Sequence, residues 1–472
     1  TTTTTAATTA TTTTTAATTT TTAAASFKDV SWVQRGAGIG GAAAWSRSGR
    51  SVSLSADGNV VAIAAPYDDD AGETSGVVRV FEWVDQAWTQ RGGDINGEAK
   101  WDHSGESLSL NSDGTIVAIG AWGNDGDSAH SDMGHARVFA LVGDEWTQLG
   151  ADLDGADAQD RFGGSVSLSA DGTVLAVGAS NNGPWAGHAR IFAWSEEGSW
   201  VQMGDAIEGE AAHDHSGSSV SLSAAGDVIA IGAPYNDGAG NDAGHVRLFA
   251  FIDDAWVQRG DDIDGPKNTN LGSVVSLSAD GTVVAAGGYV SRIFSWTNNE
   301  WKQLGADFET DFGDRAMSLS ADGRVVAFGS PQGGTGYNAG DAAVYAWDGT
   351  TWAQVDVVIE GQAPGGRLGH SVSLSADGST LAVGAPDYDS AAGIKAGQVR
   401  VFHACADCTA LPSPRPTPAP TTVESTVSWT RRGADLVGGA DGFGGFESGH
   451  SVSLSAAGDV VAVGAPRATG AA

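Results

Sequence analysis

Short runs of alternating apolar and polar residues dominate the chain. The run SVSLS begins at Ser51, and its second and fourth residues, Val52 and Leu54, are apolar while the serines are polar. A period of two places the apolar side chains on one face of a β-strand. The pair Asp57-Gly58 follows, and it is typical of a tight hairpin turn because glycine adopts positive φ without steric cost. The pattern therefore predicts a β-hairpin.

This run is the start of a repeat. Copies begin at Ser51, Ser107, Ser165, Ser219, Val274, Ala316, Ser371 and Ser451. Each ring copy continues with a second apolar run, a loop rich in Gly, Asp and Asn, and a segment like G-x-V-R-V-F; in the first six copies W-x-Q follows. We name these four predicted strands A (SVSLS), B (VVAIGAP), C (GxVRVF) and D (WxQxG). They are short, β-branched or aromatic, and no segment shows a helical period, so the unit predicts a propeller blade.

The strand order predicts how the ring closes. The chain opens with a lone D strand at 30–36, continues through six complete A-B-C-D sets, and reaches the last strand C at 399–402. A ring leaves no open sheet edge only if its ends are joined, so the first D strand is expected to pair beside the last C strand. The predicted fold class is all-β: a seven-bladed β-propeller of four-stranded antiparallel blades at residues 30–403.

The segments around the ring have different compositions. Residues 1–29 are predicted to be a Thr/Ala low-complexity linker, and residues 404–426 a Cys/Pro-rich linker whose X-Pro run is extended polyproline II. The opening Val-Ser-Trp returns at 427, so residues 427–472 are predicted to start a second propeller of a tandem array. It would be completed beyond Ala472 or by a neighbouring chain. A competing interpretation makes residues 427–466 the eighth blade of one ring.

The repeat resembles the FG-GAP repeat of the integrin α-subunit propeller and its relatives. The clearest copy runs from FGGS at 162–165 to VGA at 177–179, and the W-x-Q strand is similar to a variant found in microbial and algal surface proteins. The resemblance implies a propeller with an adhesive or ligand-binding role, although one fold hosts many functions. In integrins the A–B loop carries an Asp-rich calcium site. Here that loop, 55–58, has one carboxylate, so calcium is not expected there.

Charge narrows the classes of partner. The chain has 57 acidic and 24 basic residues, a net charge of −33. Nucleic acids and anionic membrane surfaces both select basic proteins, so neither is expected as a partner. No apolar run is long enough to cross a bilayer, which predicts no membrane insertion. With no leader sequence at its start, the chain is expected to be a mature or partial form.

Two groups of residues have metal or redox chemistry. Oxygen ligands at alternate positions of the B–C loops suit Ca²⁺, while Asp, Asn and Gly also populate ordinary turns. The candidate calcium ligands are Asp68, Asp70, Asp125 and Asp127. No cofactor is expected to be required. Cys405 and Cys408 cannot form a four-ligand zinc site alone and are predicted to be a local disulfide or two idle thiols.

Other recurring residues carry no catalytic pattern. The sequence has no nucleophile elbow, H-E-x-x-H or Walker motif, so no catalytic residue is assigned and the chain is not expected to be an enzyme. Histidines recur before strand A and at the start of strand C, at equivalent places in different blades. They cannot converge on one metal and are expected to pack. Four loop tryptophans are either a recognition surface or buried anchors. They are Trp45, Trp101, Trp122 and Trp185.

The linker suggests where the protein works. Its Ser-Pro, Thr-Pro and Ala-Pro dipeptides resemble the hydroxylated, O-glycosylated modules of algal and plant wall glycoproteins. The candidate modification sites are Pro412, Pro414, Pro416, Pro418, Pro420 and Thr417. The leading hypothesis is an extracellular structural or adhesive module of a surface array, wall or flagellar hair, which binds copies of itself or other surface and matrix proteins. The alternative is a lectin-like or integrin-like propeller that binds glycans or peptides, with Ca²⁺ at its loops.

Overall fold

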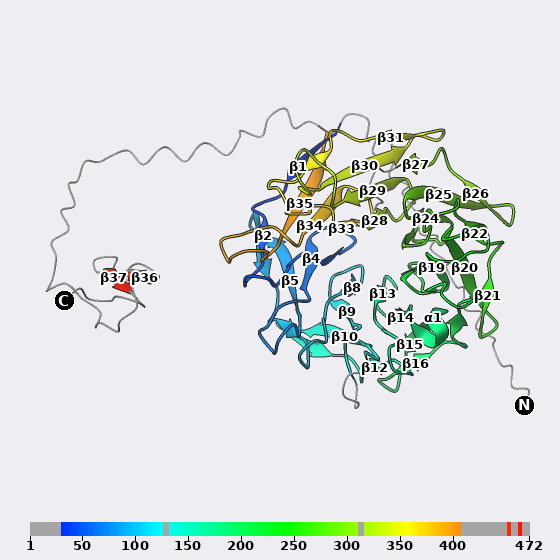
Figure 1. Ribbon diagram of the computed structural model, residues 1–472, viewed down its shortest axis with the longest axis horizontal. Coiled ribbons are helices and arrows are strands. Elements are labelled where there is room, and N and C mark those ends of the chain that lie inside the picture. Colours follow the sequence, from blue (N-terminus) through cyan, green and yellow to red (C-terminus); the bar gives the residue numbers. More distant parts are fainter. Residues whose placement is uncertain (1–29, 126–131, 310–315, 407–450, 455–460, 465–472) are drawn as a thin grey trace, which may run out of the picture. The chain divides into compact units, whose positions relative to one another are not determined.

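The computed structural model describes residues 30–125, 132–309 and 316–406, and strand residues 451–454 and 461–464. The chain divides into two units, residues 1–408 and 409–472. In the first unit, seven antiparallel sheets are arranged around a common centre, with β8, β13, β28 and β33 near that centre (Figure 1). The seven-bladed all-β fold predicted from the repeat is confirmed.

Each of the first six blades contains strands A to D in chain order and a short fifth strand. The first three blades are β3 (Ser51–Leu54), β4 (Val60–Ala65), β5 (Val77–Val84), β6 (Ala87–Gln90) and β7 (Ile95–Asn96); β8 (Ser107–Leu110), β9 (Ile116–Ala121), β10 (His135–Val142), β11 (Glu145–Gln148) and β12 (Leu153–Asp154); β13 (Ser165–Leu168), β14 (Val174–Ala179), β15 (His188–Trp194), β16 (Trp200–Gln202) and β17 (Ile207–Glu208). A short helix, α1 (Asn182–Trp185), lies in the B–C loop of the third blade.

The next three blades follow the same order. They are β18 (Ser219–Leu222), β19 (Val228–Ala233), β20 (His245–Ile252), β21 (Ala255–Gln258) and β22 (Ile263–Asp264); β23 (Val274–Leu277), β24 (Val283–Gly287), β25 (Val290–Thr297), β26 (Glu300–Gln303) and β27 (Phe308–Glu309); β28 (Ala316–Leu319), β29 (Val325–Ser330), β30 (Asp341–Trp347), β31 (Trp352–Gln354) and β32 (Ile359–Glu360).

The fifth strand is the second half of strand D. In the first blade both β6 and β7 pair with β5, and between them the Arg91 N–H donates to the Val80 carbonyl at 2.8 Å. Gly92 then interrupts the ladder with φ +76°, a conformation that side chains disfavour. The predicted four-stranded blade is therefore correct, with an outer strand in two pieces.

The seventh blade closes the ring. Its strands are β33 (Ser371–Leu374), β34 (Thr380–Ala385) and β35 (Gln398–Cys405), and its outer strand is supplied by β1 (Ser31–Gln34) and β2 (Ile39–Gly40). Ser31 pairs with Cys405, and Ile39 pairs with Val399. The expected pairing of the first D strand with the last C strand is confirmed. Strand C is longer than expected, because it runs to Cys405 rather than ending near 402.

The SVSLS motif joins neighbouring blades near the ring axis. The backbone N–H of each strand-A leucine donates to the middle serine hydroxyl of the adjacent blade at 2.9–3.0 Å. A second set of seven backbone hydrogen bonds, 2.8–2.9 Å long, passes from A–B turn to A–B turn and returns from Ala376 to Ala56. Two circles of hydrogen bonds thus close around the axis.

Tryptophans join the blades at the outer edge. In six blades the indole Nε1–H of the strand-D tryptophan donates to the carbonyl just after the W-x-Q of the preceding blade, at 2.7–3.0 Å. In the seventh blade, Nε1 of Trp32 is buried and has no hydrogen-bond partner among the described residues. Between the two edges, apolar residues of strands A, B and C pack across each blade boundary. The core is therefore a set of layers between blades.

The second unit is described only by β36 (Ser451–Leu454) and β37 (Val461–Gly464), which pair with each other. Ser451 pairs with Gly464, the register in which Ser51 pairs with Ala64. Neither strand belongs to the seven sheets of the ring. The predicted linker residues Pro412, Pro414, Pro416, Pro418, Pro420 and Thr417 lie outside the described residues, so their modification stays a prediction. No helix among the described residues is long and apolar enough to cross a membrane.

Candidate functional site

One face of the ring is built by the D–A and B–C loops, because strand A starts where strand B ends. Five of the D–A loops share a buried polar residue between two residues with left-handed backbone: Ser46, Asp102, Asp160, Asp214 and Thr269. In the second of these loops, buried Asp102 accepts the Ala99 N–H at 2.8 Å, while Trp101 (φ 70°) and His103 (φ 55°) flank it. Burial raises the pKa of Asp102. Left-handed backbone is unfavourable for such residues by about 1–2 kcal/mol, so the surrounding contacts fix these loops.

Aromatic and basic side chains of the D–A and B–C loops form a continuous row on this face. The Arg47 guanidinium lies 4.6 Å from the Tyr67 ring, and Tyr67 contacts His103 edge-on at 5.1 Å. His103 stacks on Trp122 at 5.1 Å, and Arg161 covers Trp122 at 4.7 Å. Burial lowers the pKa of His103, which keeps its imidazole neutral within the stack. The row crosses three successive blades.

A pocket of about 540 Å³ lies at the end of this row. Trp185 is 48% exposed there, and its ring centroid is 4.9 Å from that of His213. The pocket is lined by Asp132, Gln159, Arg161, Asn181, Trp185, His213 and His215. An aromatic surface surrounded by amide, carboxylate and basic groups is suited to a small polar ligand with an apolar face, such as a sugar ring. Three of the four loop tryptophans are exposed: Trp45 (55%), Trp101 (42%) and Trp185.

A second cavity, of about 330 Å³, is lined by the first residues of the A strands around the axis. Arg50 there forms an ion pair with Glu106, and one of its nitrogens lies 2.7 Å from Nε2 of His370. These groups come from neighbouring blades. Their mutual pairing makes this cavity a structural contact between blades.

The predicted calcium ligands Asp68 and Asp70 share a cation of the protein itself. Arg79 lies 3.7 Å from the Asp68 carboxylate, 3.3 Å from that of Asp70 and 2.7 Å from that of Asp94. Burial raises the pKa of Asp68, an effect that Arg79 opposes. Calcium would have to displace this guanidinium, and calcium binding stays a prediction.

The other predicted ligand pair belongs to the second blade. Asp125 accepts the Asp132 N–H at 3.2 Å, and Asp127 lies outside the described residues. Cys405 is disulfide-bonded, while Cys408, its predicted partner, also lies outside them. Asp125 lies in the B–C loop of the second blade, whereas Asp68 and Asp70 lie in that of the first, and calcium binding by Asp125 stays a prediction.

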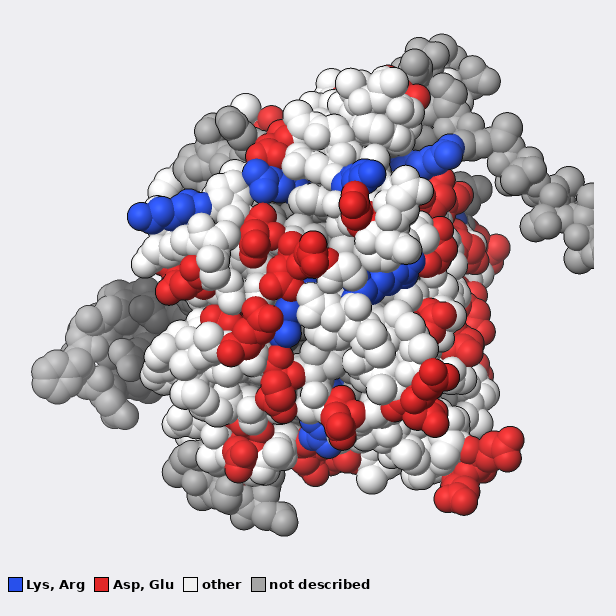
Figure 2. Space-filling model, turned by 90° about the vertical axis from the view of Figure 1, so that its right-hand side faces the viewer, with Lys and Arg blue, Asp and Glu red and all other residues white. Residues whose placement is uncertain are grey.

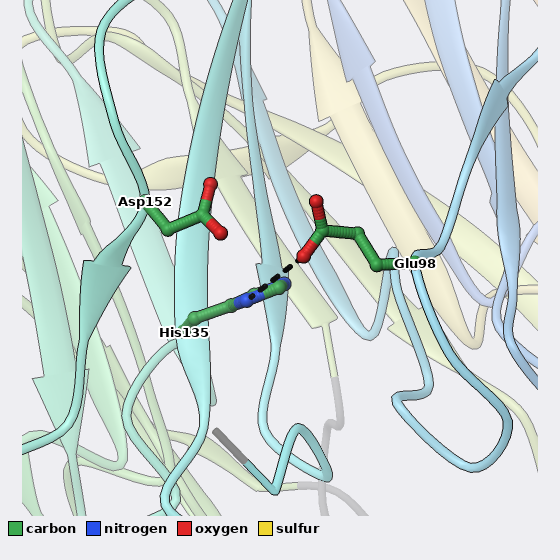
Figure 3. A group of neighbouring side chains, drawn as sticks. All are labelled: Glu98, His135 and Asp152. Carbon is green, nitrogen blue, oxygen red and sulfur yellow. Dashed lines mark ion pairs between the residues drawn. The ribbon is translucent and has the colours of Figure 1, made fainter. Parts of the chain in front are cut away.

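Sequence reasoning missed two clusters that combine neighbouring blades. They are Glu98, His135 and Asp152, and Glu210, His245 and Asp262. In the first, a glutamate that follows the D strand of one blade meets a histidine and an aspartate of the next (Figure 3). The sequence signal that could have found them is a histidine at the start of strand C together with an aspartate six residues after the strand-D tryptophan of the same blade.

A comparison with protein families agrees with the blade architecture. The family model described as FG-GAP repeat matches residues 207–249, which contain β17 to β19 and the start of β20. None of the curated proteins compared with the chain matches it. The matched segment runs from the last strand of the third blade to strand C of the fourth, in a ring whose other blades repeat the same strand order. The chain is therefore a seven-bladed β-propeller that carries the FG-GAP repeat.

Proposed function

We propose that the protein is an extracellular adhesive module that binds carbohydrate through the loop face of its ring. The observation that carries this proposal is the pocket beside the aromatic row, where the exposed indole of Trp185 lies next to hydrogen-bonding groups. FG-GAP propellers are typical of extracellular proteins and are typically non-enzymatic, which supports a binding role.

Charge favours a neutral or cationic ligand over an anionic one. The net charge is −33, and acidic side chains outnumber basic ones over the side of the ring in Figure 2. An anionic ligand would approach against this field. A neutral sugar would stack an apolar ring face on Trp185 and exchange hydrogen bonds with Asn181 and Gln159.

The ring is also suited to a mechanical role in an array. Two closed circles of hydrogen bonds join all seven blades near the axis, and the pairing of β1 with β35 completes the last blade. The hairpin β36–β37 has the register of the first A–B hairpin, which supports a second propeller after the linker. Adhesive rings joined by stiff linkers would place many weak sugar sites along one fibre, and linked sites gain avidity without new contacts.

Binding to immobilised glycans, followed by calorimetry with the best ligand, tests the proposal. Trp185→Ala is expected to weaken binding by about twofold to tenfold or more, because an aromatic contact contributes roughly 0.5–1.5 kcal/mol beyond its buried area. Trp45→Ala is the matched control, since Trp45 is equally exposed, also has left-handed backbone (φ 68°) and does not line the pocket. Absence of glycan binding, or an equal loss in both variants, would refute the proposal. Loss of binding on chelation would favour the calcium-dependent alternative.

A further inference from the structure

The strand-C histidines of the second and fourth blades each lie beside two carboxylates, an arrangement that packing of the blades alone does not require. His135 begins β10 and is 1% exposed. Its Nδ1 is 4.0 Å from the Oε2 atom of Glu98, and ligand atoms of Glu98, His135 and Asp152 all lie within 4.8 Å of one another. In Figure 3 both carboxylates lie above the imidazole of His135, that of Asp152 to the left and that of Glu98 to the right.

Neighbouring donors hold one oxygen of each carboxylate. Arg137 lies 3.2 Å from Oε1 of Glu98, and the Gln148 amide donates to Oδ1 of Asp152 at 2.6 Å. The second oxygen of each carboxylate is then available to a shared ligand. Metal-binding carboxylates are typically oriented by outer hydrogen bonds in this way.

The histidine is buried with unsatisfied hydrogen-bonding capacity. Nε2 of His135 has no hydrogen-bond partner among the described residues, and Nδ1 faces the carboxylates. Burial, and then Arg137, lower the pKa of His135 to about 4, so the ring is neutral. A neutral imidazole is the form that ligates metals.

The same arrangement occurs in the fourth blade. Nδ1 of His245 is 3.9 Å from a carboxylate oxygen of Glu210 and 3.9 Å from Oδ2 of Asp262. Gln258 donates to the other oxygen of Asp262 at 2.7 Å, and Arg247 lies 3.7 Å from the other oxygen of Glu210. Nε2 of His245 is likewise buried without a partner among the described residues.

The first and third blades lack part of the Glu-His-Asp cluster and can be compared with the second and fourth. In the third blade His188 is buried, but alanines occupy the positions equivalent to the two carboxylates, residues 156 and 206. The fold thus accommodates this histidine without the two carboxylates found at the clusters. In the first blade valine replaces the histidine, and Asp94 pairs with Arg79 of its own blade at 2.7 Å. In the second and fourth blades the equivalent arginine contacts glutamate, which releases the aspartate toward histidine.

We propose that each cluster binds one divalent transition-metal ion, of the Zn²⁺ type, through Nδ1 of the histidine and one oxygen of each carboxylate. One nitrogen and two oxygens suit zinc or manganese, whereas calcium requires six to eight oxygens. Tetrahedral zinc ligands at 2.0–2.1 Å are about 3.4 Å apart, so the histidine–carboxylate pairs at 3.9–4.0 Å would close by about half an ångström, and any pair as far apart as 4.8 Å by about 1.4 Å. Glu98 and Glu210 are partly exposed and can make that movement.

The ion would join two blades. Glutamate comes from the segment after one blade, and histidine and aspartate come from the next. Two carboxylates and one arginine sum to a charge of −1 at each cluster, which a dication reverses. A proton shared by Glu98 and Asp152 is the competing occupant, because burial and Asp152 raise the pKa of Glu98.

Metal analysis of the full chain tests the proposal. After chelation and dialysis against Zn²⁺, elemental analysis is expected to find two ions per chain, and Co²⁺ is expected to give the visible absorption of a low-coordinate site. Glu98→Gln and Glu210→Gln, at partly exposed positions, are each expected to reduce the count to one and to weaken binding at that cluster at least tenfold. His188→Ala is the matched control and should retain two ions.

The outcomes separate metal from proton. The double variant Glu98→Gln plus Glu210→Gln should bind none, with an unchanged circular-dichroism spectrum. Stoichiometric zinc in that double variant, no zinc in the original chain, or a pH-dependent melting temperature that Zn²⁺ does not alter would each overturn the proposal.

Discussion

The outer tryptophans provide a direct test of how the blades are joined. Trp146 donates its indole N–H to the Arg91 carbonyl of the preceding blade at 2.8 Å, whereas the buried Nε1 of Trp32 has no partner among the described residues. Both are partly buried, and each pairs across its strand with an aliphatic residue, Leu141 or Ala404. Replacing each with phenylalanine changes the ring in the same way but removes a hydrogen bond in only one case.

The expected difference follows from this contrast. Trp146→Phe loses a hydrogen bond and leaves the Arg91 carbonyl unpaired, which destabilises by about 1–3 kcal/mol beyond the loss of ring area. Trp32→Phe loses the same ring area but also removes an unsatisfied buried donor, which stabilises. Trp146→Phe should therefore lower the free energy of unfolding more than Trp32→Phe does, by about 1–3 kcal/mol. In a ring of roughly 370 residues this corresponds to about 1–4 °C in Tm.

Equilibrium unfolding in urea, followed by tryptophan fluorescence and circular dichroism together, measures the difference. The m-value must stay constant for the comparison to report stability alone. Trp256→Phe repeats the test, since its Nε1–H donates to the Met203 carbonyl at 2.8 Å. Equal destabilisation by Trp32→Phe and Trp146→Phe would show that indole packing, and not the hydrogen bond, joins the blades at the outer edge.

Two further changes probe the interior. Ser109→Ala removes the hydroxyl that accepts the Leu168 N–H near the axis, and it should lower the free energy of unfolding by about 1–3 kcal/mol. Urea titrations measure this, and Ser112→Ala, at an exposed position, is the control. Burial lowers the pKa of His188 below its ordinary 6.5, against the opposite effects of Glu208, Asp160 and Asp157. Below pH 6.5 the imidazole is therefore protonated in the unfolded chain but stays neutral in the folded protein. The contribution of His188 to the free energy of unfolding is present above pH 6.5 and is lost as the pH falls below it. His188→Leu should reduce the difference in stability between pH 7.5 and 5; an unchanged difference would contradict the burial argument.

The blades could be predicted because their signals are local. Alternation in SVSLS, the Asp-Gly turn and the repeated W-x-Q each lie within a few residues, and counting them gives the closure at β1 and β35. The break in strand D was missed, because Gly92 reads equally well as the end of a strand. Oxygen ligands at alternate positions made Asp68 and Asp70 candidate calcium ligands, but only the fold shows that Arg79 pairs with both carboxylates.

The clusters were harder to predict for a different reason. Glu98 and His135 are 37 residues apart in the sequence and belong to different blades, and Asp152 lies beyond a further strand. Each residue alone fits its own repeat position, as Asp94 and His188 show in other blades. The aromatic row has the same property, since its five side chains come from loops of successive blades. Contacts between blades depend on which positions of one repeat meet which positions of the next, and the sequence of a single copy does not show this.

Closure also determines how an array of such rings would carry load. The chain enters the ring at β1 and leaves it at the end of β35, and Ser31 and Cys405 are direct cross-strand partners. Tension on these two ends would act on that one pair first and would open the β1–β35 ladder one hydrogen bond at a time. The two inner circles would carry no load until β1 and β2 had separated, because neither circle includes them. The outer edge offers little resistance at this point, since Trp32 lacks the indole hydrogen bond found in the other six blades and only its backbone N–H bonds to Asp356, at 2.8 Å. In the proposed array the closing blade would therefore yield before the rest of the ring.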